Sequence, residues 1–150
     1  MVLTFIGREK TQEISHGGEV IGMVLKDMAL EGLVDKAELE SFNVPVYCPT
    51  IEEVGQVIEA ERSFTIQTLK TFKMGWDANL QEEVDYVLDS KMRGGFIAKS
   101  IRSVFEPLLM NVFGKDIMDE LFSRLATKAS QLIELDKLYY TNLVMSMRKA

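Results

Sequence analysis

The first six residues, MVLTFI, form an unbroken run of apolar and β-branched side chains that ends at Gly7. A short run that is apolar on both faces predicts a strand buried inside a sheet that is covered on both sides. The strands that pair with it have to come from later in the chain or from a part that these residues do not contain. We therefore expect residues 1–6 to lie within a larger sheet.

Helical spacing appears first between residues 19 and 33, where apolar side chains recur every three or four positions. Gly32 is placed to end this helix. The following residues predict a short helix or turn at 36–41. Pro45 then disfavours helical backbone at the residue before it, so we expect an extended or turned piece there.

A second helix is predicted by Thr50 and Glu53, which have the spacing of a capping box. The Thr50 side chain can accept a hydrogen bond from an early backbone N–H while Glu53 reaches back to the cap. This signal predicts a helix to about Ala60. Its core side is expected to consist of Val54, Val57 and Ile58.

Two further helices are predicted in the second half of the chain. The first follows Gly94 and carries Pro107 inside its apolar pattern, so we expect a kink or a split there. Gly114 separates it from the second. The apolar faces consist of Ile97, Ile101, Val104, Phe105 and Leu108 in the first helix, and of Ile117, Met118, Leu121, Phe122, Leu125 and Ala129 in the second.

Alternating patterns predict two strands. The segment 63–74 alternates with one irregular stretch, which suggests a bulge, and Phe64, Ile66, Phe72 and Met74 are expected on one face. A terminal strand is predicted at 138–147, with one face made of Tyr139, Thr141, Leu143, Met145 and Met147. The acidic segment 76–93 predicts an exposed excursion.

Composition narrows the class of protein. The 150 residues include 17 Lys and Arg against 23 Asp and Glu, a formal charge of −6, so the chain lacks the basic footprint of nucleic-acid or anionic-membrane binding. The single cysteine, Cys48, cannot form an internal disulfide, which favours a reducing compartment such as the cytoplasm. No apolar run approaches the length of a membrane span.

The residues offer little catalytic chemistry of their own. His16, the only histidine, is expected in an exposed loop, and Cys48 is expected to be a small packed residue rather than a nucleophile. No zinc-type spacing of Cys and His is present, and the glycine pairs lack the pattern of a phosphate-binding loop. Glu38, Glu40 and Asn43 form an oxygen-rich cluster of the kind that a hard cation can use. We therefore predict no catalytic residue in this chain.

Several longer motifs occur in an order that is characteristic of one family. They are MVLTFIGR, DMALEGLV, SFNVPVYCPTIEEV, SFTI, the pattern R-x-V-x-EPLL at residues 102–109, and FGKDIMDELF. Over nearly its whole length the chain resembles the C-terminal part of the plant SABATH methyltransferases. These enzymes methylate small carboxylic acids such as salicylate, jasmonate and benzoate, or xanthine nitrogens in caffeine synthesis.

The resemblance implies a fold that the spacing alone does not show. It implies a partial class I (Rossmann-like) α/β methyltransferase fold with helical cap elements, in which residues 1–6 form a central parallel strand. Residues 1–150 would then be a single incomplete domain, without the N-terminal half of the sheet. The two later strands would finish the far edge of the sheet.

The resemblance also implies the cofactor, S-adenosylmethionine, and places the family's donor-binding residues before the strand at Met1. No cofactor-binding residue is therefore expected in this chain, which would be inactive alone. The family's magnesium site maps to Glu40, Phe42 and Asn43, with Phe42 contributing its carbonyl oxygen. Most members carry Asp where Glu40 stands, so this position departs from the pattern.

Acceptor-pocket positions of the family map to Gly17, Gly18, Ile101, Val104 and Tyr140. Salicylate- and jasmonate-type members tend to carry bulky residues where the two glycines stand. The glycines would therefore leave a roomier pocket, or one that a neighbouring loop fills.

The function implied is methyl transfer to the carboxylate of a small plant acid. Two alternatives stay open: N-methylation of a xanthine, and a non-catalytic fragment that acts as an interaction or dimerisation module. A homodimer, or a dimer with a full-length homologue, is a possible assembly. No nucleic acid and no membrane is expected as a partner.

Overall fold

The computed structural model describes residues 1–80 and 87–150, and its chain divides into two compact units. The first unit contains Met1–Ser15, Tyr47–Gly75 and Tyr139–Ala150, and the second contains His16–Val46 and Trp76–Leu138. The interpretation of residues 1–150 as one incomplete domain stays a prediction.

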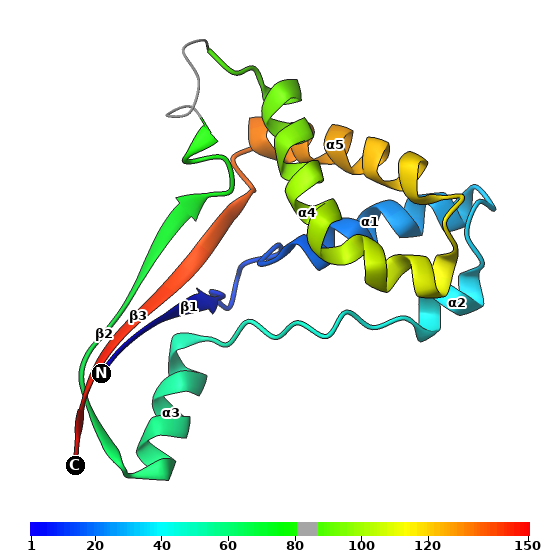
Figure 1. The fold of residues 1–150 in the computed structure, drawn as a ribbon. Coiled ribbons are helices and arrows are strands. Elements are labelled where there is room, and N and C mark those ends of the chain that lie inside the picture. Colours follow the sequence, from blue (N-terminus) through cyan, green and yellow to red (C-terminus); the bar gives the residue numbers. More distant parts are fainter. Residues whose placement is uncertain (81–86) are drawn as a thin grey trace. The chain divides into compact units, whose positions relative to one another are not determined.

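The first unit is built on a three-stranded antiparallel sheet in the order β1-β3-β2 (Figure 1). Its strands are β1 (Val2–Gly7), β2 (Phe64–Gly75) and β3 (Tyr139–Lys149). Both outer strands pair antiparallel with β3, so β1 and β2 run in the same direction. The strand that comes last in the chain therefore holds the other two together.

One face of this sheet is covered by α3 (Ile51–Glu61), whose capping box at Thr50 and Glu53 is present as predicted. The buried cluster on this face consists of Val54, Leu143, Met145 and Met147, against which Phe5, Ile51, Ile58, Phe64, Ile66 and Leu69 pack. The prediction for Val57 was wrong, since its side chain is 65% exposed. It lies at the rim of the helix rather than on the core side.

A bulge in β2 changes which residues face the core. The register against β3 shifts between Ile66 and Thr68, which confirms the predicted irregularity. Beyond the shift, Leu69 packs on the covered face, whereas Phe72 is 49% exposed. The predicted common face for Phe64, Ile66, Phe72 and Met74 was therefore wrong, because one extra residue exchanges the two faces of a strand.

The strand predicted at residues 1–6 is present, whereas its burial inside a larger sheet stays a prediction. The side chains of Val2 and Ile6 are 68% and 41% exposed. Among the described residues β1 pairs only with β3, and it does so antiparallel. Among the described residues it is the outer strand of this sheet, and its place as a central parallel strand of a larger sheet stays a prediction.

The second unit is helical, with α1 (Gly17–Leu30), α2 (Lys36–Ser41), α4 (Ser90–Phe113) and α5 (Met118–Glu134). Helix α5 packs against both α4 and α1. The residues with essentially no exposed surface include Val20, Ile21, Met28, Leu109, Leu121, Leu125 and Ala129. These helices bury their apolar faces against one another.

Helix α4 differs from its prediction at its start, and it is bent rather than split (Figure 1), which was one of the two outcomes expected. It begins at Ser90, where Asp89 caps it by accepting from the Met92 N–H, four residues before Gly94. It also continues through Pro107 without a split, and Figure 1 shows it bending along its length. The excursion expected at 76–93 falls partly on residues 81–86, which lie outside the described residues.

Local hydrogen bonds explain where α1 ends. Gly32 has φ +77°, and the N–H groups of Gly32 and Leu33 donate to the carbonyls of Ala29 and Met28 at 3.1 and 2.9 Å. This is the double hydrogen bond of a Schellman motif, and it confirms that Gly32 ends the helix. No described helix is long and apolar enough to cross a membrane.

Candidate functional site

His16 caps the start of α1 instead of lying in an exposed loop. Its Nδ1 accepts from the Gly18 N–H at 3.1 Å, and the Glu19 side chain accepts from the His16 N–H at 3.2 Å. Only 19% of the His16 side chain is exposed. The expectation of an exposed loop histidine was therefore wrong, because a ring nitrogen can serve as the N-cap acceptor usually supplied by Ser, Thr, Asp or Asn.

A hollow of about 310 Å³ lies beside this cap within the second unit. Its polar lining includes His16, Glu19 and Asn43, and its apolar lining includes Phe42 and Val44. Gly18 lines it as well, so one predicted acceptor position and two predicted metal positions share one cavity. The structure brings these three residues together although 24 to 25 positions separate Gly18 from the other two.

The two glycines at the start of α1 lie against other side chains. A Cβ added at Gly17 would stand 3.1 Å from Ile101 Cγ1, and one added at Gly18 would stand 2.8 Å from Val44 Cγ1 and 3.0 Å from the His16 ring. Both glycines are buried. Neighbouring side chains therefore occupy the space beside both glycines, and Val44 comes from the segment that follows α2.

The remaining acceptor positions lie on different elements of the two units. Ile101 is buried on α4 at Gly17, whereas Val104 is 64% exposed one turn later. Tyr140 lies on β3 in the first unit, where partial burial raises the pKa of its hydroxyl. The grouping of all five residues around one acceptor stays a prediction.

The predicted magnesium ligands are adjacent in the chain but do not form a cation cage. The Glu40 carboxylate is 69% exposed and pairs with Lys36 Nζ at 3.6 Å, while Phe42 and Asn43 line the hollow. No cluster of three or more His, Cys, Asp or Glu occurs in the described part of the chain. A single exposed carboxylate that is already paired does not fit a dedicated magnesium site, and no chemical step is assigned to the ion.

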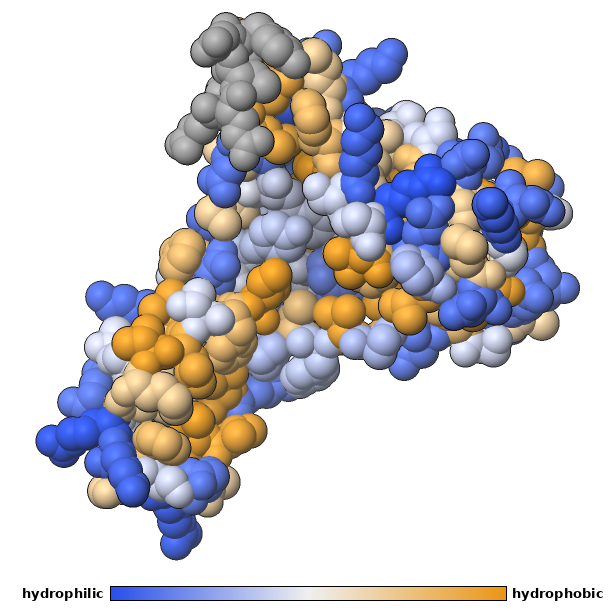
Figure 2. Space-filling model, viewed as in Figure 1, coloured by the Kyte–Doolittle hydropathy of each residue, from blue (hydrophilic) through white to orange (hydrophobic). Residues whose placement is uncertain are grey.

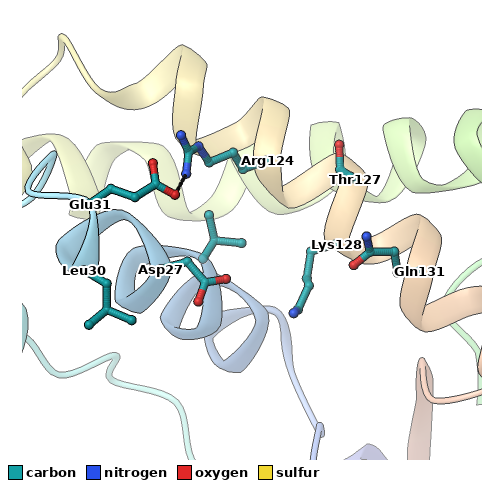
Figure 3. A pocket seen from close by; sticks show the side chains of 8 residues that line it. Asp27, Leu30, Glu31, Arg124, Thr127, Lys128 and Gln131 are labelled. Carbon is teal, nitrogen blue, oxygen red and sulfur yellow. Dashed lines mark hydrogen bonds and ion pairs between the residues drawn. The ribbon is translucent and has the colours of Figure 1, made fainter.

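A second pocket, of about 470 Å³, lies between α1 and α5 (Figure 3). Across this pocket, Arg124 Nη1 pairs with Glu31 Oε1 at 2.7 Å. Asp27, Lys128 and Gln131 also line it. The hydrogen bond from Arg124 holds the pKa of Glu31 below its usual value. This pocket contains none of the acceptor or metal positions predicted from the sequence.

The buried Cys48 is a small packed residue, as predicted.

The hydrogen bonds made by Gln12 were not predicted from the sequence. Its side chain donates to the Ile14 and Tyr139 carbonyls at 2.8 and 3.0 Å and accepts from Thr141 Oγ1 at 2.8 Å. These hydrogen bonds link the loop after β1 to the start of β3. A lone polar residue in a loop carries no periodic signal that could have revealed this contact.

Comparison with known proteins identifies the family and the fold. The family model for SAM dependent carboxyl methyltransferases matches residues 1–150. The chain is 38% identical to anthranilate O-methyltransferase 3 of Zea mays and 36% identical to 7-methylxanthine methyltransferase 1 of Coffea canephora. These matches cover 100% and 99% of the chain but only 41% and 40% of the relatives, so the chain spans about two fifths of their length.

A solved structure of a loganic acid methyltransferase with SAH matches the fold with a TM-score of 0.70. The match covers 100% of the chain and 42% of that structure at 22% identity, which speaks to the fold alone. The mixed α/β arrangement thus matches part of that structure. With the family match over every residue, the chain belongs to the SABATH family of SAM-dependent carboxyl methyltransferases.

Proposed function

We propose that this chain supplies the acceptor-binding part of a methyltransferase that transfers a methyl group from S-adenosylmethionine to the carboxylate of a small plant acid. The observation that carries the proposal is the family match over residues 1–150. The hollow beside α1 supports it, because the predicted acceptor position Gly18 lines that cavity. On this proposal the three strands are the far edge of a class I methyltransferase sheet.

The proposed methyl transfer requires no catalytic side chain from residues 1–150. S-Adenosylmethionine supplies an activated methyl group, and a carboxylate is already a nucleophile at neutral pH, so no general base is required. Rate enhancement then comes from orienting the acceptor and excluding water. Buried Ile101 and the side chain of Val44 are suited to that role, since both close the space beside the glycines.

Donor binding is proposed to reside in the part of the family domain outside residues 1–150. The 150-residue chain alone should therefore transfer no labelled methyl group to any acid or xanthine above background. The test is incubation of the purified chain with radiolabelled S-adenosylmethionine and a panel of benzoate, salicylate, anthranilate and 7-methylxanthine. Transfer to any of them would contradict the proposed location of the donor site.

A neutral xanthine nitrogen is the second candidate acceptor. The Glu19 carboxylate lines the hollow, and a carboxylate acceptor bound there would meet a like charge, whereas a xanthine would not. The xanthine methyltransferase among the relatives is consistent with this alternative. Glu19→Gln separates the candidates, because it should strengthen the binding of benzoate and leave the binding of 7-methylxanthine unchanged.

Binding can be measured without catalysis. Titration of the chain with each acceptor, followed by amide NMR shifts, should move Gly18, Asn43 and Val44. Ile101→Val, which shortens the buried side chain that lies against Gly17, should change the affinity, whereas Val104→Ala, at an exposed position on the same helix, should not. Shifts confined to the α1–α5 pocket would overturn the assignment of the hollow.

The magnesium assignment can be checked in the same way. If Phe42 and Asn43 bind the ion with Glu40, addition of magnesium chloride should shift their amides, and Glu40→Gln should abolish the effect. Lys36→Met is the matched control, because it frees the Glu40 carboxylate from its partner without removing a ligand. Equal shifts in all three proteins would reject the site.

A further inference from the structure

The pocket between α1 and α5 has two walls of opposite chemistry. The α1 wall presents two carboxylates one helical turn apart, Asp27 and Glu31. The α5 wall presents groups that can donate hydrogen bonds, spaced so that they share one face of the helix. These groups belong to Arg124, Thr127, Lys128 and Gln131. The pocket therefore offers acceptors on one side and donors on the other.

An ion pair joins the two walls at one end. Arg124 Nη1 pairs with Glu31 Oε1 at 2.7 Å. Helices α1 and α5 run in opposite directions (Figure 1), so one turn back along α1 and one turn forward along α5 the corresponding partners are Asp27 and Lys128. Their two charges are opposite, and by spacing they are the next pair of the same ladder.

This second ion pair does not form. Among the described residues, neither the Asp27 carboxylate nor the Lys128 ammonium has a hydrogen-bonding or ionic partner. Figure 3 shows both side chains on the side of the pocket away from the Arg124–Glu31 pair. Lys128 is half-buried, so its ammonium loses part of its hydration without the compensation that a carboxylate would provide. The two charges face one pocket and do not neutralise each other.

The dimensions and charges of this pocket restrict what can bind in it. Its volume of about 470 Å³ lies in the range of small-molecule sites. A simple anion would be attracted by Lys128 and repelled by Asp27, and a simple cation would meet the reverse. A molecule that has both charges avoids this conflict, because each of its charges can lie against the wall of opposite sign.

We propose that the pocket between α1 and α5 binds a small zwitterion of the amino-acid type, with its ammonium against Asp27 and its carboxylate against Lys128. The Gln131 amide follows Lys128 on the same face of α5 and can donate to the same carboxylate. Val24 and Leu30 offer apolar surface to a small side chain. The pocket shares no lining residue with the hollow beside His16, so this inference is independent of the proposed function.

The test compares three probes of similar size on the 150-residue chain. L-Alanine has both charges, propionate has only the carboxylate, and ethylamine has only the ammonium. Each probe is titrated and followed by amide NMR shifts, which for alanine should lie on α1 around Asp27 and on α5 around Lys128. Alanine should bind more tightly than either single-charge probe, by up to about fivefold, the value of one exposed ion pair.

Two neutralised variants assign each charge of the probe to its wall. Asp27→Asn should reduce the affinity for alanine to that for propionate, without weakening propionate. Lys128→Met should reduce the affinity for alanine to that for ethylamine, without weakening ethylamine. A variant that only disturbs the packing of the helices would weaken all three probes alike, so this pattern separates a binding role from a structural one.

Lys26→Met is the matched control, because it removes the charge of a lysine on α1 that does not line this pocket. It should leave the affinities for all three probes unchanged. Several results would overturn the inference: no shift with alanine, equal affinities for the three probes, equal losses in Lys26→Met and Lys128→Met, or shifts confined to the hollow around His16 and Asn43. Any of them would mean that the two charges do not act together on a ligand.

Discussion

The two units of this chain differ in where their apolar side chains are buried and where they are exposed. In the helical unit, Leu121 and Leu125 on α5 and Val20 and Ile21 on α1 have no exposed surface. In the sheet unit, only the face under α3 is buried to that extent, and Phe72 and Val2 are about half or more exposed. Both units expose apolar side chains, such as Leu30 and Val104 on the helical unit, but in the sheet unit the exposed ones include Val2 and Phe72 (Figure 2 shows one face of the molecule), which are paired within the sheet itself.

The difference shows what apolar patterning can and cannot say. A pattern of apolar residues predicts that a face is suited to burial, but it does not say whether the partner belongs to the same stretch of chain. In the helical unit the partners are neighbours in sequence, such as α4 and α5. Strand β1 has the same apolar pattern, but among the described residues no strand pairs with its second edge.

The largest effect should separate the two faces of the sheet. Leu143→Ala removes a completely buried side chain beneath α3 and should lower the free energy of unfolding by about 2–5 kcal/mol. Phe72→Ala, on the opposite face of the sheet, should cost much less because its side chain is already 49% exposed. Urea denaturation measures both, and equal losses would mean that the second face is covered after all.

A smaller effect is expected where the two long helices of the other unit cross. A Cβ at Gly94 would meet Ser130 and stand 2.5 Å from the Ala126 carbonyl oxygen, so Gly94→Ala should destabilise by about 1–3 kcal/mol. A Cβ at Gly95 would meet no described atom within 4 Å, so this position provides the matched control. Gly95→Ala should stabilise the helix by up to about 1 kcal/mol, and a loss of stability in both variants would contradict the close crossing.

Next in size is the cap that anchors α3 to the sheet unit. Thr50→Ala removes the side chain that accepts from the Glu53 N–H at 3.3 Å and should cost about 1 kcal/mol. Thr50→Ser keeps the acceptor and should cost much less. Thermal unfolding followed by circular dichroism distinguishes the two, and equal shifts would show that the hydroxyl does not cap the helix.

The smallest effect concerns the loss of folding stability at acidic pH. Hydrogen bonds from the Thr50 N–H and the Tyr47 hydroxyl, both 2.7 Å long, hold the pKa of Glu53 below its usual value. A lowered pKa contributes stability above the ordinary glutamate pKa of about 4.3, and that stability is lost as the pH falls through the lowered value. Melting temperatures should therefore fall less between about pH 5 and pH 3 in Glu53→Gln than in the wild type.

Local signals predicted most of the elements. The capping box at Thr50, the end of α1 at Gly32 and the irregularity in β2 each depend on a few adjacent residues, and the structure contains all three. The errors came from the surroundings of an element. Burial of Val57 and the common face of Phe72 depended on helix placement and on the exact site of the bulge, which periodicity does not locate.

The candidate site was predictable only through the family motifs. Those motifs selected Gly18, Phe42 and Asn43, which line one hollow. They gave no indication that His16 caps α1 or that Val44 occupies the space beside Gly18, because these contacts depend on how the segment after α2 returns to the helix. Composition and spacing alone would have ended at a mixed α/β protein.

The strand order also has a consequence for biosynthesis. Because β1 and β2 both pair with β3 and not with each other, neither has a hydrogen-bonded neighbour among the described strands until β3 has been synthesised. Contacts such as that between Met1 and Met147 span almost the whole chain, and pairings of such long range form slowly. Until β3 is available, the edges of β1 and β2 are open to pairing with other chains, which favours aggregation.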